Sequence, residues 1–352
     1  MKHIIFALLF CSAVYSLNAQ TIEGVVYDAK TRETVPGAAV YLDGTSILTI
    51  TDANGAFSLV VGNKINTNLI ISHLSYEPIV ITNPFEHRGQ AFYLHEKVNT
   101  LVEVRVVADR LSRAEKMKVF REQFLGESVA GKSCVIVNEE DIVLNYDEET
   151  HTLTGYSRNP IVIENRYLAY RITFDLRHFS FQFQRIANML DEDRVSRVLF
   201  KGTSSFVDQS PYNVQYAKRR EGIYLRSKQY FFKNLTANTL EAANIKISNR
   251  FRQIKQDQYF LITDVSSQKT VLILPNTDIN RRHLGIQEGS IYGVIDILCH
   301  RRFSSEAIFL THRFSVDEYG NPDTVDDIIF FGDIGGQRLG EMLPRDFTYT
   351  IP

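Results

Sequence analysis

The stretch EGVVYDAKTRETVPGAAVYLDGTSILTITDANGAFSLVV, residues 23–61, alternates short apolar runs with turn-forming residues. The runs GVVY, AAVYL and FSLVV are typical of strands, and the segments VPG, LDGT and TDANG supply the glycine, proline and asparagine of turns. The same alternation continues through LIISHL, AFYL and VEVRVV. Because about seven strands within about 90 residues are typical of a sandwich, we predict a β-sandwich over residues 20–108.

The pair Asn54-Gly55 lies between two apolar runs, so we predict a hairpin turn with positive φ there and Phe57 at the start of the next inward face. The alternative is a fragment of a calcium loop, Asp52-x-Asn54-Gly55. It lacks the further carboxylates and the terminal glutamate that such a loop supplies. The turn is therefore the preferred interpretation.

The order of these signatures is specific enough to suggest a family. It comprises Pro36-Gly37-Ala38, Gly44-Thr45, Thr51-Asp52, Asn54-Gly55 with Phe57, Ser72, Tyr76 and the closing Val102-Glu103-Val104. Together they resemble the carboxypeptidase regulatory-like domain, found beside metallocarboxypeptidases and at the N-terminus of many TonB-dependent outer-membrane receptors. The resemblance implies a seven-stranded transthyretin-like or immunoglobulin-like sandwich that marks a fold and carries no catalysis.

The first 19 residues, MKHIIFALLFCSAVYSLNA, combine a basic Lys2, an apolar core and a small residue at Ala19. This pattern predicts a secretory signal peptide, because the apolar core is too short to span a bilayer. We expect an exported chain that is periplasmic, associated with the outer membrane or extracellular. The formal net charge of −2 and 44% hydrophobic content indicate a folded protein and disfavour nucleic acid as a partner.

Removal of the signal peptide would leave two cysteines, Cys134 and Cys299. An exported protein can keep a disulfide, and both residues lie at the ends of predicted strands in one predicted domain. A crosslink and two buried thiols both remain open.

A phosphate-loop pattern, GESVAGKS, occurs at residues 126–133. The preceding segment LSRAEKMKVFREQFLG places Ala114, Met117, Phe120 and Phe124 on one helical face, and CVIVNEEDIVLNY after the pattern predicts a strand. A phosphate loop needs a strand before its glycines and a helix after them. We therefore predict that this loop binds no nucleotide and that Lys132 is a solvated side chain.

The remainder, assigned to one strand-rich α+β domain over residues 109–352, alternates strand and helix patterns. In YRITFDLRHFSFQF, residues 170–183, the apolar parity switches, which predicts a turn or bulge near Arg177-His178. A helical stretch is predicted for residues 212–234, and strands for QYFLIT, KTVLIL, SIYGVIDIL, AIFLTH and DIIFFG.

The segments GYSRNPIVIENRYLAYRITFDL and GQRLGEMLPRDF are similar to the C-terminal region of exported proteins of Gram-negative bacteria that begin with the regulatory-like domain. That family implies no activity for this chain. Two positions depart from it: Ala169 stands where the family usually has glycine, and Tyr230-Phe231-Phe232 stands where it has a His-Phe pair.

Searches for catalytic patterns identify no candidate residue. None of the nine histidines belongs to a His-x-x-Glu or HExxH motif, and His283, His300 and His312 are isolated. The sequence around Ser128 is not a Gly-x-Ser-x-Gly elbow. We predict no catalytic, cofactor-binding or metal-binding residue and no cofactor.

Two functions remain open. The favoured one is a non-catalytic exported binding or scaffold protein of the cell envelope, with a glycan, peptide or outer-membrane protein as partner. The alternative is an envelope hydrolase, a peptidase or glycosidase, with an accessory sandwich. Any specificity is expected after residue 110, where arginines and tyrosines mix as at interfaces: Arg219, Arg220 and Arg226 with Tyr216, Tyr224 and Tyr230. In the alternative interpretation, the tyrosines pack in the core and the arginines form a solvated face.

Overall fold

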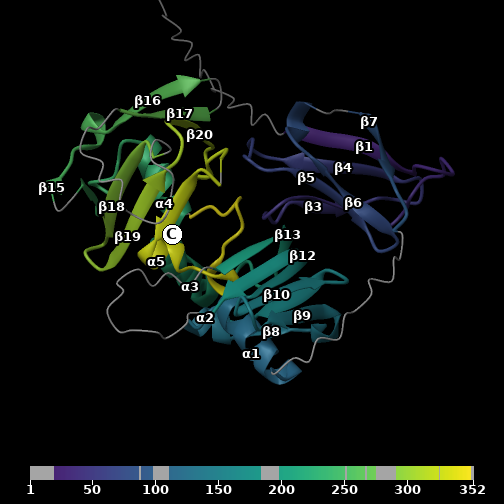
Figure 1. The fold of residues 1–352 in the computed structure, drawn as a ribbon. Coiled ribbons are helices and arrows are strands. Elements are labelled where there is room, and N and C mark those ends of the chain that lie inside the picture. Colours follow the sequence, from purple (N-terminus) through teal and green to yellow (C-terminus); the bar gives the residue numbers. More distant parts are fainter. Residues whose placement is uncertain are drawn as a thin grey trace, which may run out of the picture.

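The structure, a computed structural model, describes residues 20–86, 89–97, 111–183, 198–249, 252–265, 268–274, 291–324 and 326–349. The predicted signal peptide and the predicted strand VEVRVV, residues 102–107, lie outside these ranges. Three groups of strands separate in Figure 1: a purple and blue group, a teal group, and a green to yellow group. This arrangement confirms the predicted class, a mainly β protein with an N-terminal sandwich and a larger strand-rich region.

The N-terminal module consists of two facing sheets, with strand orders β4-β1-β7 and β3-β2-β5-β6. The strand bounds are β1 Gln20–Asp28, β2 Ala39–Leu42, β3 Leu48–Ile50, β4 Ala56–Val61, β5 Leu69–His73, β6 Tyr76–Ile81 and β7 Gln90–Leu94. Alternate side chains from both sheets form its core, among them Val26, Val40, Leu59 and Leu69. Each such burial contributes about 1.5–3 kcal/mol of transfer free energy, which holds the two sheets together.

The turn at Asn54-Gly55 forms as predicted, but the hairpin prediction is wrong. Gly55 has a φ of +69°, and the Asp52 carboxylate accepts hydrogen bonds from the amides of Asn54 at 2.8 Å and Ala56 at 2.9 Å. The preceding strand, β3, pairs with β2, whereas the following strand, β4, pairs with β1. The turn therefore carries the chain from one sheet to the other.

The middle group is a six-stranded sheet of order β8-β11-β12-β10-β9, with β13 along the other edge of β12. Its strands are β8 Cys134–Ile136, β9 Ile142–Asp147, β10 Thr152–Ser157, β11 Ile161–Asn165, β12 Tyr170–Gln182 and β13 Val198–Asp208. The β12–β13 register shifts between Leu176 and His178, which confirms the predicted irregularity.

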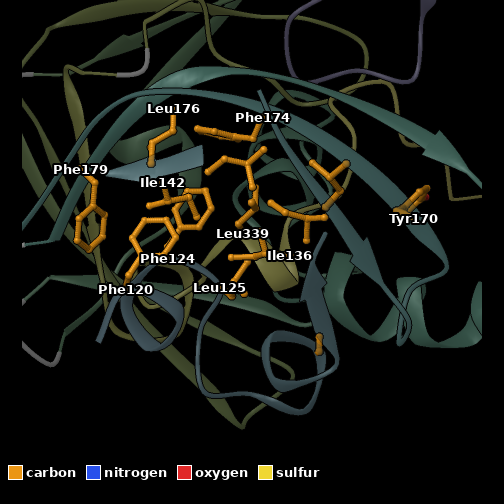
Figure 2. Close-up of a cluster of buried hydrophobic side chains, with 14 of the residues drawn as sticks. Phe120, Phe124, Leu125, Ile136, Ile142, Tyr170, Phe174, Leu176, Phe179 and Leu339 are labelled. Carbon is orange, nitrogen blue, oxygen red and sulfur yellow. The ribbon is translucent and has the colours of Figure 1, made fainter. Parts of the chain in front are cut away.

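Helix α1, Arg113–Phe124, packs on this sheet through the apolar face that the sequence predicted, except that Ala114 is exposed. It begins with a capping box in which Ser112 and Glu115 bond each other's backbone amides. The Phe120 ring lies 4.9 Å from that of Phe179, and the Phe124 ring lies 5.2 Å from that of Phe174. Figure 2 shows these rings within the buried cluster of the middle group.

The helical stretch predicted for residues 212–234 is two helices, α3 Val214–Tyr224 and α4 Lys228–Thr236. The break occurs because the Ser227 side chain accepts a hydrogen bond from the Tyr230 amide and starts a new helix.

Two sheets follow, of orders β15-β14-β18-β19-β21 and β16-β17-β20. Their bounds are β14 Ile245–Asn249, β15 Arg252–Gln253, β16 Phe260–Val265, β17 Gln268–Ile273, β18 Gly293–Cys299, β19 Phe303–Phe309, β20 Arg313–Val316 and β21 Ile328–Phe331. The short helix α5, Gly332–Gly335, follows the last strand. All five strands predicted here are present, and they surround a core of their own that includes Phe231 and Phe309. The assignment of residues 109–352 to a single domain stays a prediction.

The loop after β2 fastens the N-terminal module to the outer edge of β13. The Gly44 amide donates to the Ser204 carbonyl at 2.7 Å, and the Phe206 amide donates to the Thr45 carbonyl at 2.9 Å. The Asp43 carboxylate accepts from the Ser204 amide at 2.7 Å. The outer edge of β13 is therefore hydrogen-bonded to the N-terminal module. The β2–β3 loop of the module makes these bonds, so its polar groups already have partners within the chain.

A second junction joins the module to the C-terminal group. Asp317, 3% exposed, accepts hydrogen bonds from the amides of Asn66, Tyr319 and Asn321, each at 2.9 Å. Burial raises the pKa of Asp317, and these hydrogen bonds oppose that rise. The Arg345 amide donates to the Gly44 carbonyl at 2.7 Å, so the end of the chain also contacts the module. The groups of strands are thus tied together through polar contacts.

Candidate functional site

The phosphate-loop pattern has the flanking order that the sequence predicted. Helix α1 precedes it, and the four-residue helix α2, Val129–Lys132, leads into strand β8. The Ser128 hydroxyl accepts a hydrogen bond from the Gly131 amide at 3.1 Å and caps α2. Lys132 is exposed, as expected of a solvated side chain.

Close packing explains the glycines of this loop. A Cβ on Gly131 would lie 2.3 Å from the Gly126 carbonyl oxygen, and a Cβ on Gly340 would lie 2.5 Å from the Gly131 Cα. The Gly340 amide donates to the Leu125 carbonyl at 3.0 Å, so the two backbones are in direct contact. Figure 2 shows Leu125 and Leu339 near each other at this contact. The glycines let the segment 338–342 approach the loop.

Helix α3 begins at Asn213, whose side chain accepts hydrogen bonds from the amides of Gln215 and Tyr216. Its arginines do not form the solvated face of the alternative interpretation. Arg220 is 5% exposed and makes two hydrogen bonds to the Asp208 carboxylate, at 2.6 and 2.7 Å. Its guanidinium also lies 4.1 Å from the centre of the Tyr170 ring. Arg220 therefore joins α3 to the middle sheet.

Arg219, the preceding residue of α3, is less buried than Arg220 and contacts Tyr167 and Tyr216. Its guanidinium lies 4.7 Å from the centre of the Tyr167 ring and 5.3 Å from that of Tyr216. Its Nη1 donates to the Tyr167 carbonyl at 3.1 Å. Two cation–π contacts and one hydrogen bond thus fix the orientation of a partly exposed guanidinium.

Arg226 follows the end of α3 and forms an ion pair with Glu341. Its guanidinium lies 5.7 Å from the centre of the Phe303 ring in β19. The predicted tyrosines are mostly structural: Tyr224 is 3% exposed, and its ring lies 5.4 Å from that of partly buried Tyr230. For these two tyrosines the core interpretation is correct.

Between the loop and the outer side of α3 lies a cavity of about 530 Å³, which we call the α3 groove. From the loop side it is lined by Ser128, Val129 and Ala130. From the helix side it is lined by Gln215, Lys218, Arg219, Gly222, Ile223 and Arg226. Tyr167 and Glu341 complete it. Helices α2 and α3 lie close together in Figure 1, which agrees with a cavity lined by residues of both.

Gly222 is the unusual member of this lining. It is exposed inside helix α3, and a Cβ built on it meets nothing within 4 Å. A glycine inside a helix costs about 1 kcal/mol relative to alanine. No close contact of the described fold requires that cost, in contrast to Gly131 and Gly340.

A second cavity, of about 870 Å³, lies beside β14. Its charged lining mixes both signs, with Glu241 and Asp257 beside Lys246, Lys255 and Arg301. Among the described contacts, none of these three cations lies over an aromatic ring, in contrast to Arg219 in the α3 groove.

The cysteines are both free, so the disulfide alternative is wrong. Cys134 packs against the core of the middle group, whereas Cys299 belongs to the core of the C-terminal group. Burial raises the pKa of Cys134 to about 12 and that of Cys299 to about 11. Both thiols are therefore poor nucleophiles at neutral pH.

The isolated histidines do not form a cluster in the described part of the chain, although His283 lies outside it. His300 stacks on Tyr230 with 5.8 Å between ring centres, and the His312 ring lies 5.4 Å from that of Tyr292. Within the same residues, no group of three or more His, Cys, Asp or Glu side chains could hold a metal ion.

Sequence reasoning named Arg219 and Arg226 but missed the groove that they line. The loop residues Ser128–Ala130 lie more than 80 positions before α3 and reach it through long-range packing. Gly222 was the available signal, since a glycine inside a predicted helix is unfavourable without a reason.

Within the described residues, no helix has the length and apolar character needed to cross a bilayer.

The N-terminal module is the part of the chain that matches a known family. No curated protein matches the chain. Residues 22–106 match the family model of the CarboxypepD_reg-like domain, so the N-terminal sandwich is a domain of this family.

Proposed function

We propose that the protein is a non-catalytic, exported binding protein of the cell envelope and that its ligand binds in the α3 groove. The observation that carries the proposal is Gly222, which leaves open space in a helix beside oriented cationic side chains. A site that binds a ligand needs such a concave surface with a few fixed polar groups.

The N-terminal module contributes to this function by holding the chain together. Its loop residues Gly44 and Thr45 bond to β13, and Asn66 bonds to Asp317. Because these groups are used within the chain, we place the ligand site after residue 110. The signal-peptide pattern in residues 1–19 supports the exported location.

The groove offers little for hydrolysis. Its lining includes one carboxylate, Glu341, which forms an ion pair with Arg226. The Ser128 hydroxyl accepts the bond that caps α2. These contacts favour a binding role over that of the alternative hydrolase.

Photocrosslinking in the cells that produce the protein tests the proposal. A photoreactive residue replaces Val129, which lines the groove and is 70% exposed, or Val60 on β4, which is 64% exposed and serves as the control. We expect a crosslinked adduct from position 129 that Gly222→Trp removes, and none from position 60. An adduct from position 60 alone, or no adduct from position 129, would contradict the proposal.

A further inference from the structure

We infer that the α3 groove binds an acidic peptide segment, with the Arg219 guanidinium receiving a carboxylate of the peptide. This inference rests on the proposed function and names its ligand class. It depends on three features of the groove: an oriented guanidinium, an excess of positive charge, and open space over Gly222.

The guanidinium of Arg219 is already in place. It lies over the rings of both Tyr167 and Tyr216, and its described hydrogen bond, to the Tyr167 carbonyl, uses Nη1. A guanidinium presents further N–H groups in a fork that matches a carboxylate. Since the side chain is oriented before binding, less conformational entropy is lost when the ligand arrives.

The charge of the lining favours an anion. Lys218, Arg219 and Arg226 carry positive charges, and Glu341 is the carboxylate among the lining residues. Because Glu341 pairs with Arg226, Lys218 and Arg219 provide the excess charge. Lys218 is exposed, so it adds attraction without a defined geometry.

The remaining lining suits a peptide better than a sugar. Exposed Val129 offers an apolar contact for a side chain, and the amide of exposed Gln215 can bond a peptide backbone. The Arg219 guanidinium lies over both tyrosine rings. It therefore occupies a face of each ring that a sugar would need for stacking. Gly222 leaves its part of the lining free of a side chain.

Fluorescence anisotropy with the full mature chain tests the inference. The probe is a fluorescein-labelled pool of tetrapeptides with Asp or Glu at two positions, and the control pool carries Asn or Gln there. Because a bidentate charged hydrogen bond is worth about tenfold or more in affinity, we expect the acidic pool to bind at least about tenfold tighter. Binding should weaken as salt rises from low to high concentration.

Three variants sharpen the result, each checked by thermal unfolding to confirm that it is folded at the assay temperature. Arg219→Lys keeps the charge but loses the fork, so binding of the acidic pool should fall about tenfold. Gly222→Phe should abolish binding by filling the groove. Lys132→Gln removes an exposed charge outside the lining and should change the affinity less than about twofold.

Equal affinity for the acidic and neutral pools would overturn the inference, as would an Arg219→Lys variant that binds like the wild type. Binding of a uronic-acid oligosaccharide in place of the acidic pool would also overturn it. If the Val129 crosslink forms but no acidic peptide binds, the ligand class is wrong and the proposed function stands. If the crosslink fails as well, both are wrong.

Discussion

The loop Gly126–Ser133 and helix α3 border the same groove, yet a glycine occurs in each for a different reason. Gly131 is required because any side chain would collide with the Gly126 carbonyl. Gly222 has open space above it, and the described fold would accept a side chain there. The glycine-rich loop looks like a nucleotide site in the sequence but serves packing, whereas the glycine in α3 leaves the open space in which we propose that a ligand binds.

The adjacent arginines of α3 divide in the same way. Arg220 is buried and paired with Asp208, whereas Arg219 is partly exposed and contacts the rings of Tyr167 and Tyr216. Neighbours on a helix point about 100° apart, so one faces the sheet and the other faces the groove. The first should control stability and the second binding.

The largest expected effect is that of Arg220→Met. The change leaves the Asp208 carboxylate without its partner, and we expect a loss of about 3 kcal/mol in the free energy of unfolding, less than a fully buried pair because Asp208 retains some exposure. Arg219→Met should lose no more than about 1 kcal/mol. Guanidinium chloride denaturation measures both, and equal losses would remove the distinction between the two arginines.

Gly131→Ala should destabilise the protein by about 2–3 kcal/mol, because the new methyl group forces two backbones apart. The same denaturation experiment measures it. A loss below about 0.5 kcal/mol would show that the loop does not need its glycine for packing.

A half-buried cation, Lys228, provides a contrast to the exposed Lys218 of the groove. Burial, with the nearby charge of Arg345, lowers the pKa of Lys228 to about 8. A lowered pKa means that the charged form of the lysine is less favourable in the folded state than in the unfolded state. The free energy of unfolding therefore decreases as the pH falls from 10.5 through about 8.

Lys228→Met should therefore stabilise the protein at pH 7, on the order of 1–2 kcal/mol since the side chain keeps some solvent contact. The gain should shrink as the pH rises from 8 towards 10.5. Thermal unfolding of both proteins at pH 7 and pH 10 measures the difference. A gain that grows with pH would have the wrong sign.

The smallest effect on stability is that of Gly222→Ala. Alanine is the better helix former and meets no neighbour within 4 Å, so the free energy of unfolding should rise by about 1 kcal/mol. A destabilised variant, again by chemical denaturation, would mean that the fold itself needs this glycine.

The sequence predicted the N-terminal sandwich and most strands because their pattern is local. Side chains alternate with a period of two, and the bulge at Leu176–His178 follows from a parity switch in the same pattern. The break between α3 and α4 was missed because Ser227 acts as a cap within an otherwise helical pattern. The passage of the chain from one sheet to the other at Asn54-Gly55 was missed because a turn sequence does not indicate which strands will pair.

The groove could not be predicted for a different reason. Its two walls come together through the Gly131–Gly340 contact and the Arg220–Asp208 ion pair, both of which depend on the tertiary fold. The sequence named Arg219 without showing that Tyr167, 52 positions earlier, orients it.

The central claim is that the open space over Gly222 receives the ligand. The most direct measurement compares binding of the acidic peptide pool to Gly222→Trp and to Gly62→Trp, since Gly62 is also exposed with nothing within 4 Å of its Cβ position, but lies in the N-terminal module. We predict that Gly222→Trp abolishes binding while the protein stays at least as stable as the wild type, and that Gly62→Trp binds normally. Unchanged binding by Gly222→Trp, or equal loss in both variants, would contradict the claim.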